Sequence, residues 1–263
     1  MTSDPRALIG ILRTSHDQLA ALAGPLGPDQ LRAQSYDTDW TVAQVLSHLG
    51  SGAEIAAGGL PAAVSGTGQF DPAGFQPIWD DWNSKTPEAQ AADALTWDEQ
   101  HVSQLEQLTD EELAGIRLDF FGRQLDAAGL VRMRLSEHAM HTWDVAVVSD
   151  PAATVLPAAV PEALEQIGGL LPFVAKPAGD SFRVRLRTTS PDGDYLLDVG
   201  EPVSLSPWVD GTESDGTGVD GTIELPAEAL LRLLYGRLDP EHTPAYTADG
   251  IDLDRLRAVF PGF

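Results

Sequence analysis

The sequence predicts an α+β fold in which an N-terminal four-helix bundle is followed by a smaller α+β domain. Four amphipathic segments with helical periodicity precede residue 150, and period-two alternation follows it. The 263 residues also exceed the length of about 150 that a single domain commonly has. We therefore expect two domains, the bundle over residues 1–152 and the α+β domain over residues 153–263.

The first two helices begin at capping signals. Asp4 can cap a helix that has Pro5 at its first position, and apolar residues then recur at helical spacing up to residue 24. The second helix begins at Thr41, which forms a capping-box pattern with Gln44, and is expected to reach about residue 57.

The other two helices of the bundle follow a long interruption. Residues 58–77 are rich in glycine and proline and predict a long surface loop. A third helix is expected from Pro87 to about residue 108, and a fourth over residues 124–148, where Asp150 and Pro151 end it. Four helices with one long connection favour an up-and-down bundle.

Beyond residue 150 the pattern is typical of a sheet with a few helices. Alternation of apolar and polar side chains predicts strands at residues 182–187, 195–199 and 221–225. A Gly/Asp-rich loop is expected at residues 206–221, a helix after Pro226 and a last helix at residues 254–260.

The charge balance restricts the partners of the protein. The chain has 40 acidic against 16 basic residues, with a formal net charge of −24. Such a surface repels nucleic-acid phosphates and anionic membranes. The sequence has no apolar segment long enough to span a bilayer, and its start does not resemble a secretory signal. We expect a cytoplasmic protein that binds neither nucleic acid nor membrane.

The absence of cysteine restricts the chemistry. It excludes disulfides, thiolate metal ligands and a cysteine nucleophile. Any thiol chemistry must therefore use a thiol that a cofactor supplies.

Two histidines and one glutamate form the main candidate site. His48 lies on the second helix among apolar neighbours, while Glu137 and His141 lie four residues apart on one face of the fourth. A carboxylate on a face that packs into a bundle is costly unless it is paired or metal-bound. The three side chains predict a divalent-metal site with one position open to water or substrate. A single histidine on an apolar face is more often a hydrogen-bonded core residue than a metal ligand, so the prediction depends on the set of three.

Neighbouring polar residues are interpreted less specifically. Asp144 shares the face of Glu137 and either orients His141 or begins the polar end of the helix. His138 lies about 100° around the helix and is interpreted as a packing or surface residue. The pattern does not match the zinc-protease motif, in which a histidine precedes the glutamate. No partner can be assigned to His16, His101 or His242.

Two stretches of the sequence carry a family resemblance. The run from Trp40 to Leu49 contains His48, and the run from Arg134 to Val145 contains Glu137 and His141. Together they resemble the mycothiol-dependent maleylpyruvate isomerase family of the DinB-like superfamily. The C-terminal part is similar to that family's small domain, which is related to sterol carrier proteins. The resemblance thus implies a DinB-like metal-binding bundle before a sterol-carrier-protein-like domain.

The resemblance also implies roles for individual residues. It implies metal ligation by His48, Glu137 and His141, and a contribution of Asp144 to activity. The resemblance implies a cleft between the bundle and the small domain. An arginine of the small domain is expected to face this cleft and bind cofactor or substrate. Arg237 is the candidate, with Arg232 close by. The chain departs from many relatives at residues 138–140, which leaves the substrate open.

The function implied is that of an enzyme with a divalent metal, expected to be Zn²⁺, and mycothiol. It would isomerise a small electrophilic substrate or transfer the thiol sulfur to it, as a monomer or homodimer. One alternative is a metal-dependent hydrolase that activates water at the same site. The other is a non-catalytic protein that binds metal or thiol.

Overall fold

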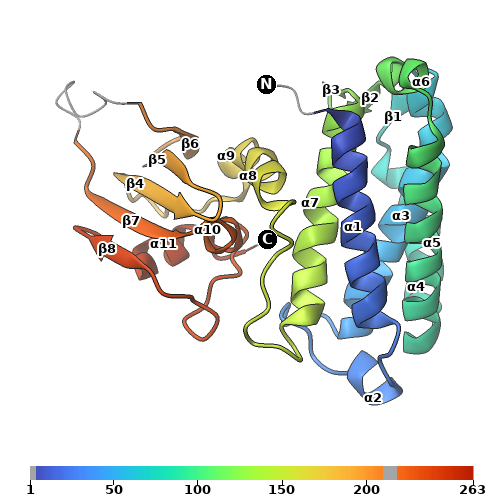
Figure 1. The fold of residues 1–263 in the computed structure, drawn as a ribbon, viewed down its shortest axis with the longest axis horizontal. Coiled ribbons are helices and arrows are strands. Elements are labelled where there is room, and N and C mark those ends of the chain that lie inside the picture. The colour runs from blue at the N-terminus through green and yellow to red at the C-terminus, as the bar shows by residue number, and fades with distance from the viewer. Residues whose placement is uncertain (1–3, 210–217, 263) are drawn as a thin grey trace. The chain divides into compact units, whose positions relative to one another are not determined.

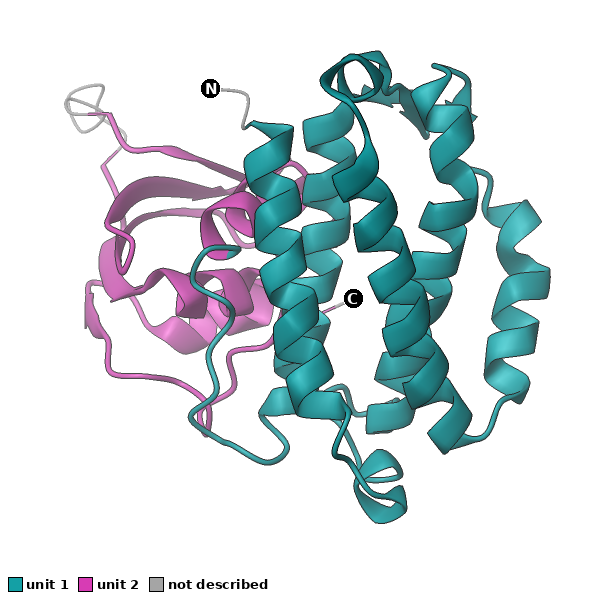
Figure 2. Cartoon of the chain, turned by 45° about the vertical axis from the view of Figure 1, so that its right-hand side comes forward, with its two compact units in different colours: residues 1–159 teal, residues 160–263 magenta. Residues whose placement is uncertain are grey.

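The computed structural model describes residues 4–209 and 218–262 and divides the chain into two compact units, residues 1–159 and 160–263 (Figure 2). The first unit is almost entirely helical and the second contains a five-stranded sheet, which confirms the predicted α+β fold class. The boundary predicted after residue 152 stays a prediction. Among the described residues, no helix is long and apolar enough to cross a lipid bilayer.

Four long helices form the bundle of the first unit (Figure 1). Helix α1 packs against α5 and α7, and α3 packs against the same two helices. Each buries an apolar stripe of the kind that the sequence predicts. The four helices are α1 (Pro5–Ala23), α3 (Val42–Val64), α5 (Pro87–Gln107) and α7 (Ala127–Ala146).

The caps expected from the sequence are present. The side chain of Asp4 accepts a hydrogen bond from the Arg6 N–H at the start of α1. At the start of α3, Thr41 Oγ1 accepts from the Gln44 N–H, and the Thr41 N–H donates to Gln44 Oε1. This reciprocal capping box fixes the residue at which α3 begins, and with it the position of His48 six residues later.

The long loop predicted at residues 58–77 is wrong. Helix α3 continues to Val64 with Pro61 inside it, and another helix begins at Pro72. The apolar face of α3 extends without interruption through Ala57, Leu60 and Ala63, all buried. The burial of this face outweighs the low helix propensity of the glycines and of Pro61.

Short elements complete the first unit. A small sheet of order β1-β2-β3, in which β1 runs parallel to β2, lies at one end of the bundle (Figure 1). The short elements are α2 (Pro28–Leu31), β1 (Gly68–Gln69), α4 (Pro72–Ser84), α6 (Asp110–Gly115), β2 (Leu118–Phe120) and β3 (Arg123–Leu125).

Close packing at Gly50 holds α3 against α4 and α5. A Cβ atom at this position would lie 2.2 Å from the Trp82 ring and 2.8 Å from the Ala94 Cα atom. The Trp82 side chain is fully buried, and its indole N–H donates to Glu54 Oε2 at 2.7 Å. Neither neighbour can yield easily, so only glycine fits here.

We expect Gly50→Ala to lower the free energy of unfolding by about 1–3 kcal/mol, because overpacking exceeds the gain in helix propensity. Gly58 and Gly59 on the same helix provide the control, since a Cβ there meets nothing within 4 Å. Alanine at either position should be neutral or stabilising by up to about 1 kcal/mol. Urea unfolding of the three variants would show the difference, and a neutral Gly50→Ala would contradict this account.

The second unit is a five-stranded sheet with helices on one face. Its strand order is β6-β5-β4-β7-β8, with β4 parallel to β7 and the other pairs antiparallel. Alternate residues of β4 and β7, including Val184, Leu186 and Ile223, are buried and form the core with helix α10. The elements are α8 (Val160–Gly168), α9 (Leu171–Val174), β4 (Phe182–Thr189), β5 (Gly193–Val199), β6 (Ser204–Pro207), β7 (Gly221–Pro226), α10 (Ala227–Leu234), β8 (Thr247–Asp249) and α11 (Leu253–Val259).

The sequence predicts most of these elements at the correct place. The three predicted strands correspond to β4, β5 and β7, and the helix expected after Pro226 is α10. The connection predicted at residues 206–221 is shorter in the structure than in the prediction, because β6 extends to Pro207 and β7 begins at Gly221. Residues 210–217 of that loop lie outside the described residues.

Candidate metal centre

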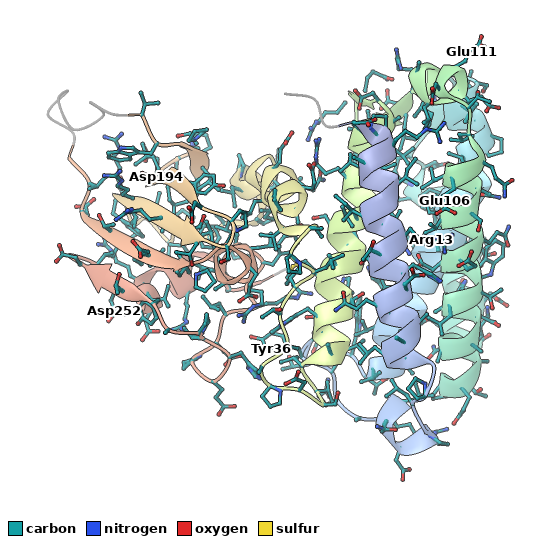
Figure 3. All side chains as sticks on the ribbon, in the orientation of Figure 1. Arg13, Tyr36, Glu106, Glu111, Asp194 and Asp252 are labelled. Carbon is teal, nitrogen blue, oxygen red and sulfur yellow. The ribbon has the colours of Figure 1, made fainter. Side chains whose placement is uncertain are left out.

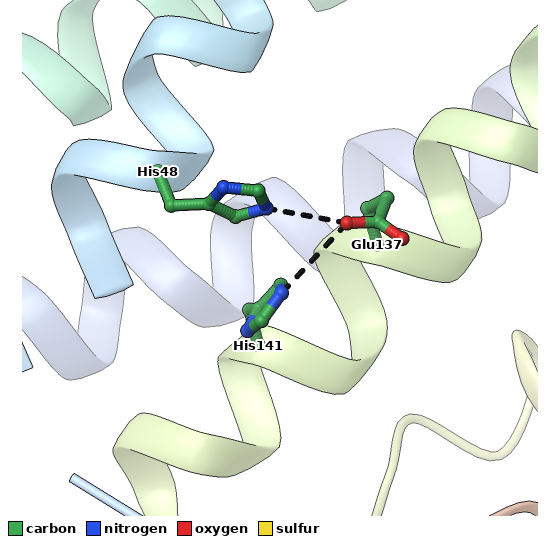
Figure 4. A group of neighbouring side chains, drawn as sticks. All are labelled: His48, Glu137 and His141. Carbon is green, nitrogen blue, oxygen red and sulfur yellow. Dashed lines mark hydrogen bonds and ion pairs between the residues drawn. The ribbon is translucent and has the colours of Figure 1, made fainter. Parts of the chain in front are cut away.

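His48, Glu137 and His141 converge on one point between two helices of the bundle (Figure 4). His48 projects from α3, and Glu137 and His141 project from successive turns of α7. The Nε2 atoms of His48 and His141 lie 3.2 Å and 3.7 Å from Glu137 Oε2. The structure therefore brings together the three side chains that the sequence singles out on different helices.

The hydrogen bond of His141 fixes which of its ring nitrogens can act as a ligand. Its Nδ1 atom lies 2.8 Å from Oδ2 of Asp144, whose side chain is fully buried. When the Asp144 carboxylate is ionised it only accepts hydrogen bonds, so Nδ1 then carries the proton and the lone pair of Nε2, which lies near Glu137, is left for a metal ion. A carboxylate that orients a ligand histidine in this way is a common feature of metal sites.

One side of the site is covered and another is accessible. The Trp40 ring lies 5.1 Å from the His48 ring and 6.0 Å from the His141 ring, centroid to centroid. The His141 side chain is 11% exposed, whereas those of His48 and Glu137 are 40% and 47% exposed. His48 and Glu137 are thus accessible to a small molecule, whereas His141 is nearly buried and hydrogen-bonded to Asp144.

The donor set and its spacing fit a divalent cation. One candidate ligand atom from each residue lies within 4.8 Å of the others. Ligands about 2.1 Å from one tetrahedral ion are about 3.4 Å apart, which falls within the range of the contacts here. Two imidazoles and one carboxylate are also the donors that a catalytic zinc site with one open position uses.

The sequence comparison identifies the family. The family model described as the mycothiol maleylpyruvate isomerase N-terminal domain matches residues 12–146, which include all three candidate ligands and Asp144. The chain belongs to this family. No curated protein matches its sequence at a significant level.

Solved structures of this family share the fold over nearly the whole chain. One is a crystal structure of the mycothiol-dependent maleylpyruvate isomerase, with a TM-score of 0.66 and 13% sequence identity, covering 94% of this chain and 93% of the other. A second is a mutant of that isomerase with one histidine replaced by alanine, with a TM-score of 0.63 and 13% identity, covering 89% and 90%. At this level of identity the likeness establishes the fold.

The arginine expected from the small domain lies just after α10 in the second unit. Arg237 is half-buried, and its Nη1 donates to the Tyr235 carbonyl at 3.1 Å. Arg232 is buried instead, forms a two-point ion pair with Glu228 and donates to the His242 carbonyl at 2.8 Å. Arg232 is therefore committed to the core of its own unit, which leaves Arg237 as the candidate.

Sequence reasoning missed a buried ionic cluster centred on Asp98 of α5. Asp98 Oδ2 lies 2.8 Å from His16 Nδ1 and 2.7 Å from His138 Nε2, and Asp98 Oδ1 accepts from Arg134 Nη2 at 2.8 Å. We call Asp98, His16, Arg134 and His138 the Asp98 cluster. All four residues are buried, and they join helices α1, α5 and α7.

In the Asp98 cluster, the negative charge of the buried carboxylate is compensated by Arg134 and by the two histidines. Burial alone would raise the pKa of the Asp98 carboxyl, but its contacts with His138, His16 and Arg134 outweigh burial and hold that pKa well below its usual value. The hydrogen bond to Asp98 in turn raises the pKa of His16. Asp98 is therefore ionised at neutral pH although it is fully buried.

Of the two interpretations of His138, packing or surface residue, the structure agrees with the first, but neither included the polar partners of its ring. His138 is fully buried, and its second nitrogen, Nδ1, lies 2.7 Å from Ser15 Oγ. One signal in the sequence could have found its partner. Asp98 shares the buried face of α5 with Ala91, Ala94 and Leu105, and a carboxylate on such a face needs a cation.

The two other unassigned histidines are not among the candidate ligands found in the described residues. His101 is fully buried on α5, and burial lowers its pKa to about 3, so its ring is neutral. His242 lies in the second unit, where its Nδ1 is 2.7 Å from Asp239 Oδ2.

Proposed function

We propose that this protein is a metal-dependent enzyme that uses mycothiol and isomerises a small electrophilic substrate or transfers the thiol sulfur to it. The observation that supports the proposal most is the convergence of His48, Glu137 and His141, with Asp144 behind His141, in a chain of the mycothiol maleylpyruvate isomerase family. Maleylpyruvate is the substrate named for the solved relatives.

Three side chains would hold the metal, for which we expect Zn²⁺. The Nε2 atoms of His48 and His141 and one oxygen of Glu137 would be its ligands. When bound, a divalent cation supplies a Lewis acid that lowers the pKa of a coordinated thiol, so that a thiolate forms near neutral pH. Asp144 keeps the His141 ring in the tautomer and orientation that this requires.

A borrowed thiol agrees with the composition of the chain. Without cysteine, the protein cannot supply a sulfur nucleophile of its own. The accessible side of the site, at His48 and Glu137, would admit the thiol and a small electrophile. We propose that Arg237 binds cofactor or substrate, because a guanidinium binds a carboxylate of a small substrate with two parallel hydrogen bonds. We keep a monomer or homodimer as the expected assembly.

The test combines metal analysis, thiol binding and turnover on the purified full-length protein. We expect about one equivalent of divalent metal per chain. Mycothiol at a hundredfold excess over its Kd should raise Tm by roughly 5 °C or more, since such an excess stabilises a fold by about 2.7 kcal/mol. Turnover of maleylpyruvate or of a related electrophile should require added thiol.

Each alternative gives a different result. Turnover without any thiol would replace this proposal with the hydrolase that activates water. Metal binding without thiol-dependent turnover, over a broad panel of electrophiles, would indicate a non-catalytic binding protein. Removal of the metal with a chelator should abolish both turnover and the Tm shift caused by mycothiol.

A further inference from the structure

Arg134 joins the two helices that carry the candidate ligands. It belongs to α7, three residues before Glu137, and its Nη2 donates both to Asp98 Oδ1 at 2.8 Å and to the backbone carbonyl of Leu49 at 2.9 Å. Leu49 follows His48 directly on α3. One guanidinium therefore links α7 to α3 at the level of the site, with α5 as the third support.

Helix α3 has space for this guanidinium. A Cβ atom at position 52 would lie 3.0 Å from Arg134 Nη1, so the glycine found there allows the close approach. Gly50, two residues earlier, admits Trp82 and Ala94 in the same way. Glycine is unfavourable inside a helix, yet two glycines follow His48 within the next turn of α3. Both allow a neighbouring helix to approach closely beside His48.

The Asp98 cluster fixes α7 from its other side. His138 is adjacent to Glu137, and its ring is held between Asp98 Oδ2 and Ser15 Oγ, both at 2.7 Å. These partners belong to α5 and α1. Rotation or sliding of α7 would have to break the hydrogen bonds of His138 and the ion pair between Arg134 and Asp98, in a buried setting where water cannot replace them.

We propose that Arg134 and Asp98 are positioning residues that fix the separation of α3 and α7, and with it the geometry of the metal site. The inference rests on the proposed metal site. The hydrogen bonds given above for Arg134 and Asp98 go to Leu49, to His16 and His138, and to each other, so the two residues act through the helices that carry the ligands. A shift of α7 against α3 by about 1 Å would spoil the convergence of His48 with Glu137 and His141, because ligand distances tolerate only about ±0.2 Å.

The test uses Co²⁺ as a spectroscopic substitute for the native metal in Arg134→Met. We expect Co²⁺ and Zn²⁺ affinities, measured by chelator competition, to fall about 10- to 100-fold, as for the loss of other groups that orient ligands. The visible absorption bands of bound Co²⁺ should shift or weaken, because they depend on ligand geometry.

A double variant separates positioning from stability. Arg134→Met with Asp98→Asn removes the buried charge that the single variant leaves without its arginine, so stability should recover in part. The link to the Leu49 carbonyl is still missing, and metal affinity should stay low. Arg134→Lys retains a cation for Asp98, but its side chain is one atom shorter and does not reach the point between the two acceptors that Nη2 occupies, so it should give intermediate affinity.

Two controls on α5 match these variants. Glu106 pairs with Arg13 of α1 on the outside of the bundle, at 2.8 Å, and the two face each other in Figure 3. Glu106→Gln removes an ion pair of the same helix that touches neither ligand helix. Leu105→Ala lowers stability at a fully buried position two turns from Asp98. Both should bind Co²⁺ with the affinity and spectrum of the unchanged protein.

The outcomes distinguish the two proposals. If the unchanged protein binds Co²⁺ and the Arg134 variants bind it with the same affinity and spectrum, the positioning role is overturned and the metal site stands. Recovery of metal affinity together with stability in the double variant would also overturn it. If the unchanged protein binds no divalent metal, both the metal site and this inference fail.

Discussion

Replacing His48 with alanine is expected to abolish metal binding and to lower thiol-dependent turnover by at least about a thousandfold. A bound metal contributes several kcal/mol of transition-state stabilisation, and about 4 kcal/mol corresponds to a factor of a thousand. His48 is the only ligand candidate from α3, whereas Glu137 and His141 come from neighbouring turns of α7. Two ligands on one helix do not hold an ion as tightly as three from two helices.

The His48→Ala substitution should have little effect on the stability of the fold, so a loss of turnover can be attributed to the loss of the metal. The His48 side chain is 40% exposed and its contact with Glu137 is surface-accessible, so, with both proteins measured free of metal, its removal should change the free energy of unfolding by less than about 1 kcal/mol. His242→Ala is the matched control, since this histidine is not among the candidate ligands and pairs with the neighbouring Asp239. Full turnover in His48→Ala, with metal still bound, would refute the site.

Features that depend on residues close together in the sequence, such as helix caps and helix faces, could be predicted. The caps at Asp4 and Thr41 satisfy backbone groups within three residues, so the chain itself specifies where α1 and α3 begin. The ligand candidates could be predicted for a similar reason. Glu137 and His141 share a face through helical periodicity alone, and His48 needed only the assumption that α3 and α7 pack together.

Features that depend on tertiary packing could not be predicted. Residues 58–64 read as a loop because glycine and proline disfavour a helix locally, yet buried contacts of Leu60 and Ala63 keep α3 intact. The partners of Asp98 come from two other helices, 82 residues before it at His16 and 36 and 40 residues after it at Arg134 and His138. No local rule connects positions so far apart, although a carboxylate on the buried face of α5 indicates that some cation must meet it.

The Asp98 cluster is where we expect the largest loss of stability. Asp98→Ala should lower the free energy of unfolding by about 3–5 kcal/mol near pH 6, because it leaves Arg134 and two histidines buried without their common carboxylate. The Asp93→Ala variant on the same helix is the control. Asp93 pairs with Lys85 at a half-exposed position, and its loss should amount to less than about 1 kcal/mol.

The pH dependence of this loss follows from two pKa shifts of opposite sign. The folded pKa of Asp98 lies well below its usual 3.8, so the stability that Asp98 contributes is present above pH 3.8 and disappears as the pH falls through the folded pKa. The folded pKa of His16 lies above its usual 6.5, so the contribution of His16 is complete below pH 6.5 and disappears as the pH rises through that raised pKa. The difference in stability between the unchanged protein and Asp98→Ala should therefore be widest between about pH 4 and pH 6.5. Urea titrations at pH 3, 5.5 and 8.5 would measure it, and a difference that does not vary with pH would mean that Asp98 and His16 do not form an ion pair in solution.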